Sequence, residues 1–312
     1  MLRFRELVTV AAVVLSWLGA ASATAQRSMS PRGVRMVDVD GHAVRVQAIG
    51  LDRRRTGGPI VVFEAGAASG LDAWSRVLPK VANHAAVVAY DRAGLGLSEW
   101  DNEEPTPRHV ANRLRRLLEK IGARPPYILV GHSWGGNLAR YFAGYHPGDV
   151  AGLVFVDAGP IVTESLAQRL APFNAIGAGR AGFDAYWSRL GALFDRAPPA
   201  VRAEVAVFRH LVQLDSAELD LPRIPDVPVV AIIAAKYLPL PMLQLPFDAQ
   251  AYFEADVRHR IELLQEWALA SPRGTLVVSN HSTHAVPRED PDVIVWSIER
   301  ILRSTDATMK AR

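Results

Sequence analysis

A short stretch near the middle of the chain most constrains how this sequence can fold. The apolar run Tyr127–Val130 leads into Gly131-His132-Ser133-Trp134-Gly135, and apolar side chains at helical spacing follow. This order predicts a strand, a very tight turn and a helix, and the glycines on either side leave room where any side chain would clash. The turn would hold Ser133 in a strained conformation with Oγ clear of the sheet. We interpret Ser133 as a nucleophile; the alternative is an ordinary serine in a glycine-rich turn.

The rest of the chain alternates apolar runs with stretches of helical spacing. A hairpin is expected around Asp40-Gly41, because two alternating strands flank this turn signal. Further strands are expected at residues 59–64, 85–90, 153–156, 227–235 and 275–279, and helices at 71–82, 106–121, 252–270 and 292–303. Continuous apolar strands separated by helices predict an α/β fold, with a mostly parallel sheet covered by helices on both faces.

The strand and helix rhythm lapses between residues 159 and 225. This stretch holds several helix-like segments rich in Leu, Ala, Phe and Trp, and the rhythm resumes at Val227. We therefore expect a core of residues 34–158 and 226–303, with residues 159–225 as a helical insertion that covers the site as a cap. A second, unrelated small domain is the alternative.

Composition excludes several classes of function. The chain has 312 residues, of which 49% are hydrophobic and 21% charged, which suits one large domain with an insertion or two small domains. A formal charge of +3 without a basic stripe argues against a nucleic-acid partner. The chain has no cysteine, which excludes disulfides, thiolate chemistry and cysteine-ligated metals.

The first 25 residues have the pattern of an export signal. Arg3 and Arg5 precede an apolar stretch, Leu7–Leu18, and Ala23-Thr24-Ala25 offers a small-residue cleavage site. The apolar stretch has 12 residues, whereas a membrane span needs about 20, so cleavage is favoured over an uncleaved anchor. We expect a secreted or periplasmic protein without stable membrane insertion.

These motifs, taken in order, resemble the α/β-hydrolase superfamily over about residues 34–303. The resemblance rests on the hairpin, Phe63-Glu64-Ala65-Gly66, Tyr90-Asp91-Arg92-Ala93-Gly94, Gly131-His132-Ser133-Trp134-Gly135-Gly136, Phe155-Val156-Asp157, and His284 ahead of Pro291. It implies the α/β-hydrolase fold and hydrolysis by a nucleophile, a base and an acid. Related haloalkane dehalogenases and epoxide hydrolases attack with aspartate, so a serine here argues against both reactions. The fold hosts many chemistries and says little about the substrate.

Two histidines are candidates for the base. In related hydrolases the catalytic histidine typically sits seven residues before the proline that begins the final helix. His284 has this spacing from Pro291, whereas His281 lies ten residues away. The resemblance therefore favours His284, with His281 as a residue of the loop.

The acid has two main candidates. Many relatives place it after the strand that precedes the histidine strand, but that strand here ends in Ala234-Ala235-Lys236-Tyr237, without a carboxylate. Asp157 ends the strand after the nucleophile helix, a position that some relatives use, and an aspartate there could also simply cap a loop. Asp248 and Asp256 lie further on and could reach back through a long loop. We choose Asp157 over Asp248, and either choice keeps the order Ser, Asp, His.

The remaining elements of the site are backbone groups. By resemblance the oxyanion hole combines the N–H of Trp134 with that of Ala67. Glu64 is expected to anchor its loop, and His132 to pack against adjacent loops. No phosphate-binding glycine loop and no His-Glu-x-x-His motif occurs, and the implied mechanism needs no metal or organic cofactor.

The resemblance implies a serine hydrolase that cleaves a carboxylic ester of a hydrophobic small molecule. Amide or lactone hydrolysis, a peptidase and an acyltransferase are alternatives with the same machinery. A non-catalytic binding protein that kept the fold is an alternative from another class. The oligomeric state is open.

Overall fold

The fold is described from a computed structural model, which covers residues 32–158, 164–215, 218–219, 223, 225–270 and 273–310. The predicted export signal in residues 1–25 lies outside these residues, as do residues 159–163, where the predicted cap begins.

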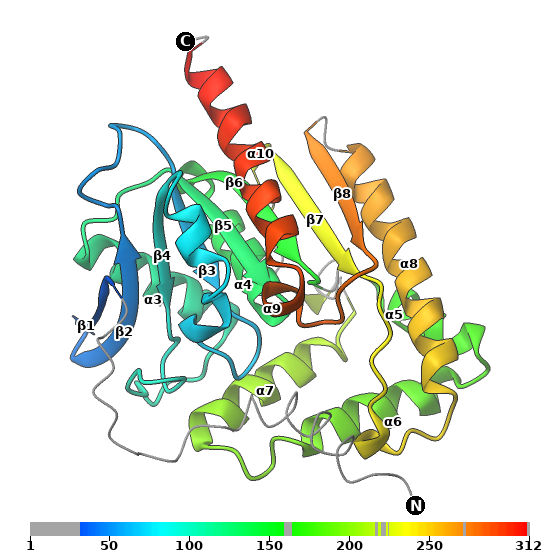
Figure 1. Cartoon of the computed structure of the whole chain (residues 1–312). Coiled ribbons are helices and arrows are strands. Elements are labelled where there is room, and N and C mark those ends of the chain that lie inside the picture. Colours follow the sequence, from blue (N-terminus) through cyan, green and yellow to red (C-terminus); the bar gives the residue numbers. More distant parts are fainter. Residues whose placement is uncertain are drawn as a thin grey trace, which may run out of the picture.

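The described strands form one mixed sheet of eight in the order β1-β2-β4-β3-β5-β6-β7-β8. The strands are β1 (Val34–Val39), β2 (His42–Ile49), β3 (Ile60–Glu64), β4 (Ala86–Tyr90), β5 (Tyr127–His132), β6 (Val150–Val156), β7 (Val229–Ala234) and β8 (Gly274–Ser279). The β1–β2 and β2–β4 pairs are antiparallel, and all other pairs are parallel. Because β5, β6, β7 and β8 are parallel neighbours, the residues that follow them meet at one end of the sheet (Figure 1).

Helices cover both faces of this sheet, as the sequence predicts. The helices are η1 (Leu71–Trp74), α2 (Leu78–Val81), α3 (Pro107–Lys120), α4 (Trp134–Tyr145), η2 (Pro147–Asp149), α5 (Leu166–Ala175), α6 (Gly179–Ala192), α7 (Pro199–Leu211), η4 (Pro241–Leu243), α8 (Ala249–Ala270), α9 (Val286–Glu289) and α10 (Pro291–Lys310). Alternate strand residues pack against α3 and α4 on one face, and the intervening residues pack against α2, α9 and α10 on the other. The apolar strands are therefore buried on both sides, which is why they read as unbroken hydrophobic runs.

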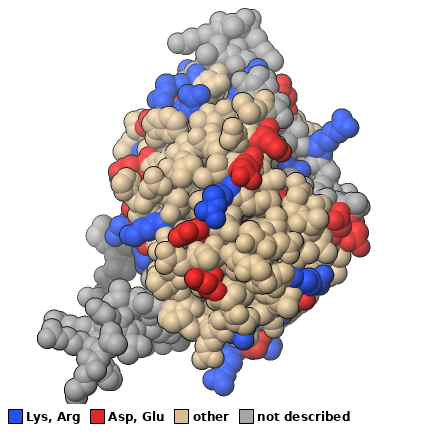
Figure 2. Space-filling model, turned by 90° about the vertical axis from the view of Figure 1, so that its right-hand side faces the viewer, with Lys and Arg blue, Asp and Glu red and all other residues tan. Residues whose placement is uncertain are grey.

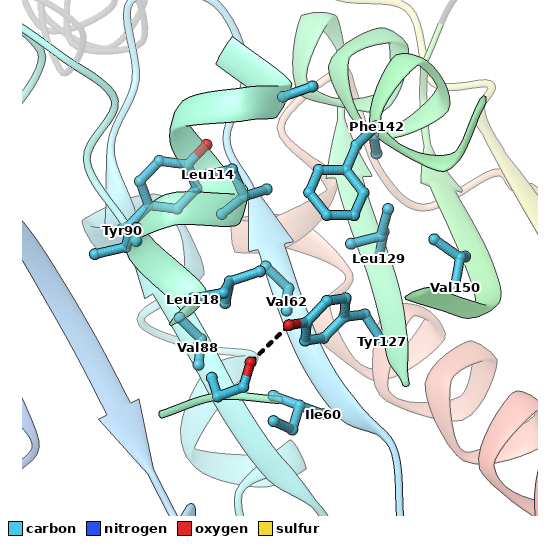
Figure 3. Close-up of a cluster of buried hydrophobic side chains, with 14 of the residues drawn as sticks. Ile60, Val62, Val88, Tyr90, Leu114, Leu118, Tyr127, Leu129, Phe142 and Val150 are labelled. Carbon is cyan, nitrogen blue, oxygen red and sulfur yellow. Dashed lines mark hydrogen bonds between the residues drawn. The ribbon is translucent and has the colours of Figure 1, made fainter. Parts of the chain in front are cut away.

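Figure 3 shows the core on the α3 and α4 face. Val62 and Leu129 project from neighbouring strands toward Leu118 and Phe142, and all four side chains are at most 2% exposed. Burying a side chain of this size contributes roughly 1.5–3 kcal/mol of folding free energy. Tyr127 brings a hydroxyl into this core, and it donates to the carbonyl of Ala123 over 2.6 Å, so the polar atom is not left unpaired.

One expected helix is divided. The sequence pattern predicts a helix over residues 71–82, whereas the structure has η1 at Leu71–Trp74 and then α2 at Leu78–Val81. The cause is Pro79, because its ring clashes with the carbonyl four residues earlier and it has no N–H to donate, so a helix that starts at residue 71 is interrupted before it. The apolar residues of both pieces still face the sheet.

The insertion between β6 and β7 contains α5, α6 and α7. Figure 1 shows α6 and α7 across the end of the sheet toward which the arrowheads of β7 and β8 point. The insertion therefore lies over the carboxyl ends of the strands. Its first helix, α5, begins with a capping box, in which the Ser165 hydroxyl accepts from the N–H of Gln168 and the Gln168 side chain accepts from the Ser165 N–H.

The surface carries both signs of charge. On the face shown in Figure 2, Lys and Arg are interspersed with Asp and Glu, and neither sign forms a continuous patch there. Within the described part of the chain, none of the helices combines the length and apolar character needed to cross a bilayer.

Candidate active site

The turn between β5 and α4 holds Ser133 in a strained conformation. Its backbone has φ +52° and ψ −124°, in a region that non-glycine residues rarely occupy. The Ser133 N–H donates to the carbonyl of Val156 over 3.0 Å, which fixes the corner against β6. A Cβ on Gly131 would lie 2.4 Å from the carbonyl oxygen of Gly135, and a Cβ on Gly135 would lie 2.2 Å from the carbonyl oxygen of Glu64. Only glycine fits at these two positions, and this steric requirement explains the glycines of the sequence motif.

A carboxylate and an imidazole meet beside this turn. Asp157 follows β6 with φ +44°, and His284 lies in the loop after β8. His284 Nδ1 is 2.6 Å from Asp157 Oδ2, so the two groups share a hydrogen bond across residues 127 positions apart in the sequence. The His284 side chain is 49% exposed, whereas that of Asp157 is 4% exposed. The carboxylate is thus buried behind an accessible imidazole.

Two further donors bind the other oxygen of this carboxylate. Asp157 Oδ1 accepts from the N–H of Ala234 over 2.9 Å and from Nη1 of Arg260 over 2.7 Å. Burial by itself raises the pKa of Asp157, but the charge of Arg260 and the bonds from His284 and Ala234 outweigh it and hold the pKa well below its usual value. The carboxylate therefore stays ionised and keeps a full negative charge beside His284.

Arg260 is a residue that the sequence interpretation missed. It lies on α8, and its Nε is 2.9 Å from Oδ2 of Asp256, one helical turn earlier. Burial lowers the pKa of Arg260, but Asp157 and Asp256 raise it by more, so the guanidinium remains charged. The only signal in the sequence is the spacing of Asp256 and Arg260, which predicts a pair on one helix but not that this helix reaches Asp157.

The two alternative candidates lie away from this arrangement. Asp248 is exposed and stands at the start of α8, where Oδ1 accepts from the N–H of Gln250 over 2.9 Å and of Ala251 over 3.0 Å. These bonds are those of a helix cap. His281 is exposed in the loop after β8. The structure therefore brings Asp157, rather than Asp248, to His284.

A cavity of about 430 Å³ lies between the strand ends and the insertion. Ser133, Asp157 and His284 line it, together with Ala67 and Trp134. The remainder of the wall is mainly aromatic and aliphatic and includes Phe173, Phe183, Tyr186, Trp187, Leu190, Leu193, Phe194, Phe208, Leu238, Leu240, Met242, Leu243, Tyr252 and Phe253. All five residues predicted for the site therefore face one largely apolar chamber.

The two backbone groups predicted to hold an oxyanion are available in this chamber. Trp134 is the first residue of α4, so its N–H has no carbonyl within the helix to bind. Ala67 lies in the loop after β3, and its N–H makes no hydrogen bond to the described residues. Both amides can therefore donate a hydrogen bond to a ligand oxygen. No group of three or more His, Asp or Glu side chains in the described ranges is arranged to hold a metal ion.

His132 packs against His284 and bonds to the backbone of the loop after β8 that carries it. Its ring is buried, with the centroid 4.8 Å from that of His284, and its Nε2 lies 2.8 Å from the carbonyl oxygen of His284. Since a carbonyl only accepts, Nε2 carries a proton and donates it to this oxygen. Burial, followed by the proximity of His284, lowers the pKa of His132 to about 3. A neutral donor is thus locked under the loop that carries His284.

His132 is expected to make the free energy of unfolding depend on pH. In the unfolded chain the pKa of His132 returns to about 6.5, whereas in the folded protein it is about 3. Between these two pH values the unfolded state therefore binds a proton that the folded state does not bind. The stability that depends on the neutral ring is fully present above pH 6.5 and is lost as the pH falls toward 3. When the pH is lowered from 7 to 5, the free energy of unfolding of wild type, measured by urea titration, should fall by about 2 kcal/mol more than that of His132→Gln. Equal losses in the two proteins would contradict the assignment.

Comparison with known proteins places the chain in a family. The sequence profile described as the alpha/beta hydrolase fold matches residues 58–294. The chain is 29% identical over 119 residues to the uncharacterized protein YqjL of Bacillus subtilis, covering 38% of this chain and 46% of YqjL. It is 35% identical over 83 residues to the soluble epoxide hydrolase of Corynebacterium sp., covering 27% of this chain and 28% of that protein. The chain thus aligns with less than half the length of either relative.

The solved structures extend the likeness to the whole fold. A probable hydrolytic enzyme from Pseudomonas aeruginosa superimposes with a TM-score of 0.61 at 18% identity, over 89% of this chain and 96% of that one. At this identity the likeness speaks for the architecture alone. The profile match covers most of the chain and agrees with the strand order, the tight turn and the helices described above. The chain therefore belongs to the alpha/beta hydrolase fold family.

Proposed function

We propose that the protein is a serine hydrolase that cleaves a carboxylic ester through an acyl-enzyme. The observation that carries the proposal is the 2.6 Å contact between His284 Nδ1 and the buried, ionised Asp157, in the chamber that Ser133 also lines. A carboxylate bound to Nδ1 leaves Nε2 free to take a proton and stabilises the imidazolium that forms. Membership of the family supports a hydrolase, and the residues of this chain favour the serine type.

The mechanism uses these groups in sequence. Ser133 Oγ attacks the ester carbonyl carbon and gives its proton to His284 Nε2, and the N–H groups of Trp134 and Ala67 hold the oxygen that becomes negative. His284 then protonates the leaving alcohol as the carbon–oxygen bond breaks, which leaves an acyl group on Ser133. Water then attacks the acyl carbon and gives a proton to His284. His284 passes this proton to Ser133 Oγ as the bond between Ser133 and the acyl group breaks and the carboxylic acid is released. Asp157 keeps its charge throughout.

The shape and polarity of the chamber favour a hydrophobic substrate. A volume of about 430 Å³ suits a small molecule, and the wall around Ser133 consists mainly of aromatic and aliphatic side chains. A polar or polymeric chain would leave its hydrogen-bonding groups unpaired against this wall. We therefore propose an ester with a hydrophobic acyl or alcohol part.

The likeness to an epoxide hydrolase does not favour epoxide opening here. A carboxylate nucleophile can attack an epoxide carbon directly and form an ester that water later cleaves. The tight turn of this chain carries the hydroxyl of Ser133, which needs a base to be activated and suits attack on a carbonyl carbon. Amides and lactones contain the same carbonyl group and are tested in the same experiment.

The proposal is tested by labelling and turnover. The purified protein is treated with a fluorophosphonate probe, and the labelled peptide is identified by mass spectrometry. It is then assayed with p-nitrophenyl esters of graded acyl length, with matched anilides and lactones as competitors. Labelling of Ser133 together with ester turnover is expected. A protein that is folded but neither labelled nor active would be a binding protein, and preference for the anilide or lactone would correct the substrate class.

A further inference from the structure

The loop that carries Ala67 is held in place by side chains from elsewhere in the chain. Arg92 donates from Nη1 to the carbonyl of Ala65 and from Nη2 to that of Gly66, each over 2.6 Å. The N–H of Ala68 donates to Oε1 of Glu204 over 2.8 Å. Ala68 has φ +56°, a left-handed conformation that strains a residue with a Cβ. The strained loop is therefore kept in shape by Arg92 and Glu204.

Arg92 and Glu204 form a buried bidentate ion pair. Arg92 Nε lies 2.6 Å from Oε2 of Glu204, and Nη2 lies 2.8 Å from Oε1. On its other side Arg92 Nη1 binds Glu64 over 2.8 Å, and the hydroxyl of Tyr90 donates to Glu64 over 2.6 Å. Arg92, Glu64 and Glu204 are 4%, 3% and 2% exposed. Removing one partner would leave a charge unpaired inside the protein, so the arrangement holds as a unit.

Glu204 comes from the insertion, whereas its partners come from the core. It lies on α7, Arg92 follows β4, and the strained loop follows β3. The two parts are in close contact here. Gly94 lies so near to Ala200, in the first turn of α7, that a Cβ added to the glycine would be 2.2 Å from the Cβ of Ala200. Glu204 does not itself line the chamber around Ser133, although Val205 and Phe208 of the same helix do. It cannot touch substrate and acts only through the loop.

We propose that Glu204 is a positioning residue, through which the cap helix α7 sets the placement of the Ala67 N–H in the oxyanion hole. This inference rests on the proposed function and extends it. The carboxylate binds the amide of Ala68 directly, and it places Arg92, which binds the two preceding carbonyls. The peptide of Ala67 lies between these fixed points. Formation of the oxyanion hole therefore depends on the docked position of α7, and the insertion takes part in catalysis as well as covering the site.

The test is the substitution Glu204→Gln, which keeps the shape of the side chain but removes the charge that holds Arg92. A displacement of about 1 Å in a reacting group can cost about 100-fold in rate, so kcat for a p-nitrophenyl ester should fall by about 10–100-fold. KM should change by less than about threefold, because ground-state contacts with the chamber wall are kept. Glu204→Ala should lower kcat further. Arg202→Ala, an exposed residue of the same helix, is the matched control and should behave as wild type.

A transition-state analogue separates positioning from general damage. An alkyl boronic acid forms a tetrahedral adduct with the serine and places one oxygen in the oxyanion hole. In Glu204→Gln its affinity should fall by the same factor as kcat/KM, while the affinity for the carboxylic acid product stays unchanged. Wild type and all variants are assayed at one temperature, chosen below the melting temperature of the least stable variant.

Two results would overturn the inference. One is wild-type kcat and boronic acid affinity in Glu204→Gln. The other is an equal loss of affinity for the boronic acid and for the product, which indicates a disturbed chamber. Failure of the proposed function has a different signature, since wild type itself would then be neither labelled on Ser133 nor active on esters.

Discussion

Replacing Ser133 by alanine is expected to lower kcat/KM for a p-nitrophenyl ester by at least about 10⁴-fold. The substitution removes the one oxygen that can form the acyl-enzyme, and only the oxyanion donors and the chamber remain to assist direct attack by water. The change deletes a hydroxyl that makes no hydrogen bond to the described residues. Folding should therefore be retained, and the loss should appear in kcat with little change in substrate binding.

The control for this experiment is Ser75→Ala, a serine in an exposed turn away from the chamber. It should retain wild-type turnover and a fluorophosphonate label on Ser133, whereas Ser133→Ala should lose the label. Melting temperatures of both variants are compared with that of wild type. Turnover within tenfold of wild type in Ser133→Ala would show that another group forms the acyl-enzyme.

Replacing Asp157 by asparagine is expected to lower kcat by about 10⁴-fold. The amide carries no charge to stabilise the imidazolium of His284, and an NH₂ group facing Nδ1 would favour the tautomer with its proton on Nε2, which cannot act as base. Arg260 would also lose the anion that it binds over 2.7 Å, so some loss of stability is expected. Turnover is measured below the melting temperature of the variant to separate the two effects.

Asp248→Asn is the matched variant for this substitution. Asp248 caps α8 through Oδ1, and asparagine caps helices equally well, so activity within about twofold of wild type is expected. If Asp248→Asn abolished turnover while Asp157→Asn kept it, the acid would have been assigned to the wrong residue.

Local signals explain how much of the site can be predicted from the sequence. The corner at Ser133 is predictable because the strand, the glycines and the helix that create it lie within about 20 consecutive residues. Pro291 does begin the final helix, so the spacing that favours His284 refers to a real boundary. The strands are predictable for a similar reason, since burial on both faces makes each an unbroken apolar run. The helix expected over residues 71–82 shows the limit, because the pattern is helical while Pro79 divides the segment.

The choice between Asp157 and Asp248 required the tertiary structure. Both precede His284 in the chain, and either could be the acid on sequence order alone. The proposal of Asp157 follows from the strand order β6-β7-β8, which puts the residue after β6 within reach of the loop after β8. Strand order is set by long-range packing of helices on both faces, and no local pattern encodes it.

The sequence by itself determined the fold class, the strained corner at Ser133 and a short set of candidate partners, because each depends on neighbouring residues or on burial patterns of fixed period. Only the tertiary structure assigned Arg260 to the carboxylate of Asp157 and Glu204 to the loop of Ala67. These two charges lie on helices α8 and α7, where a charged residue by itself suggests a solvated face. Their roles come from helix docking, which brings groups more than 100 residues apart into contact and buries them together.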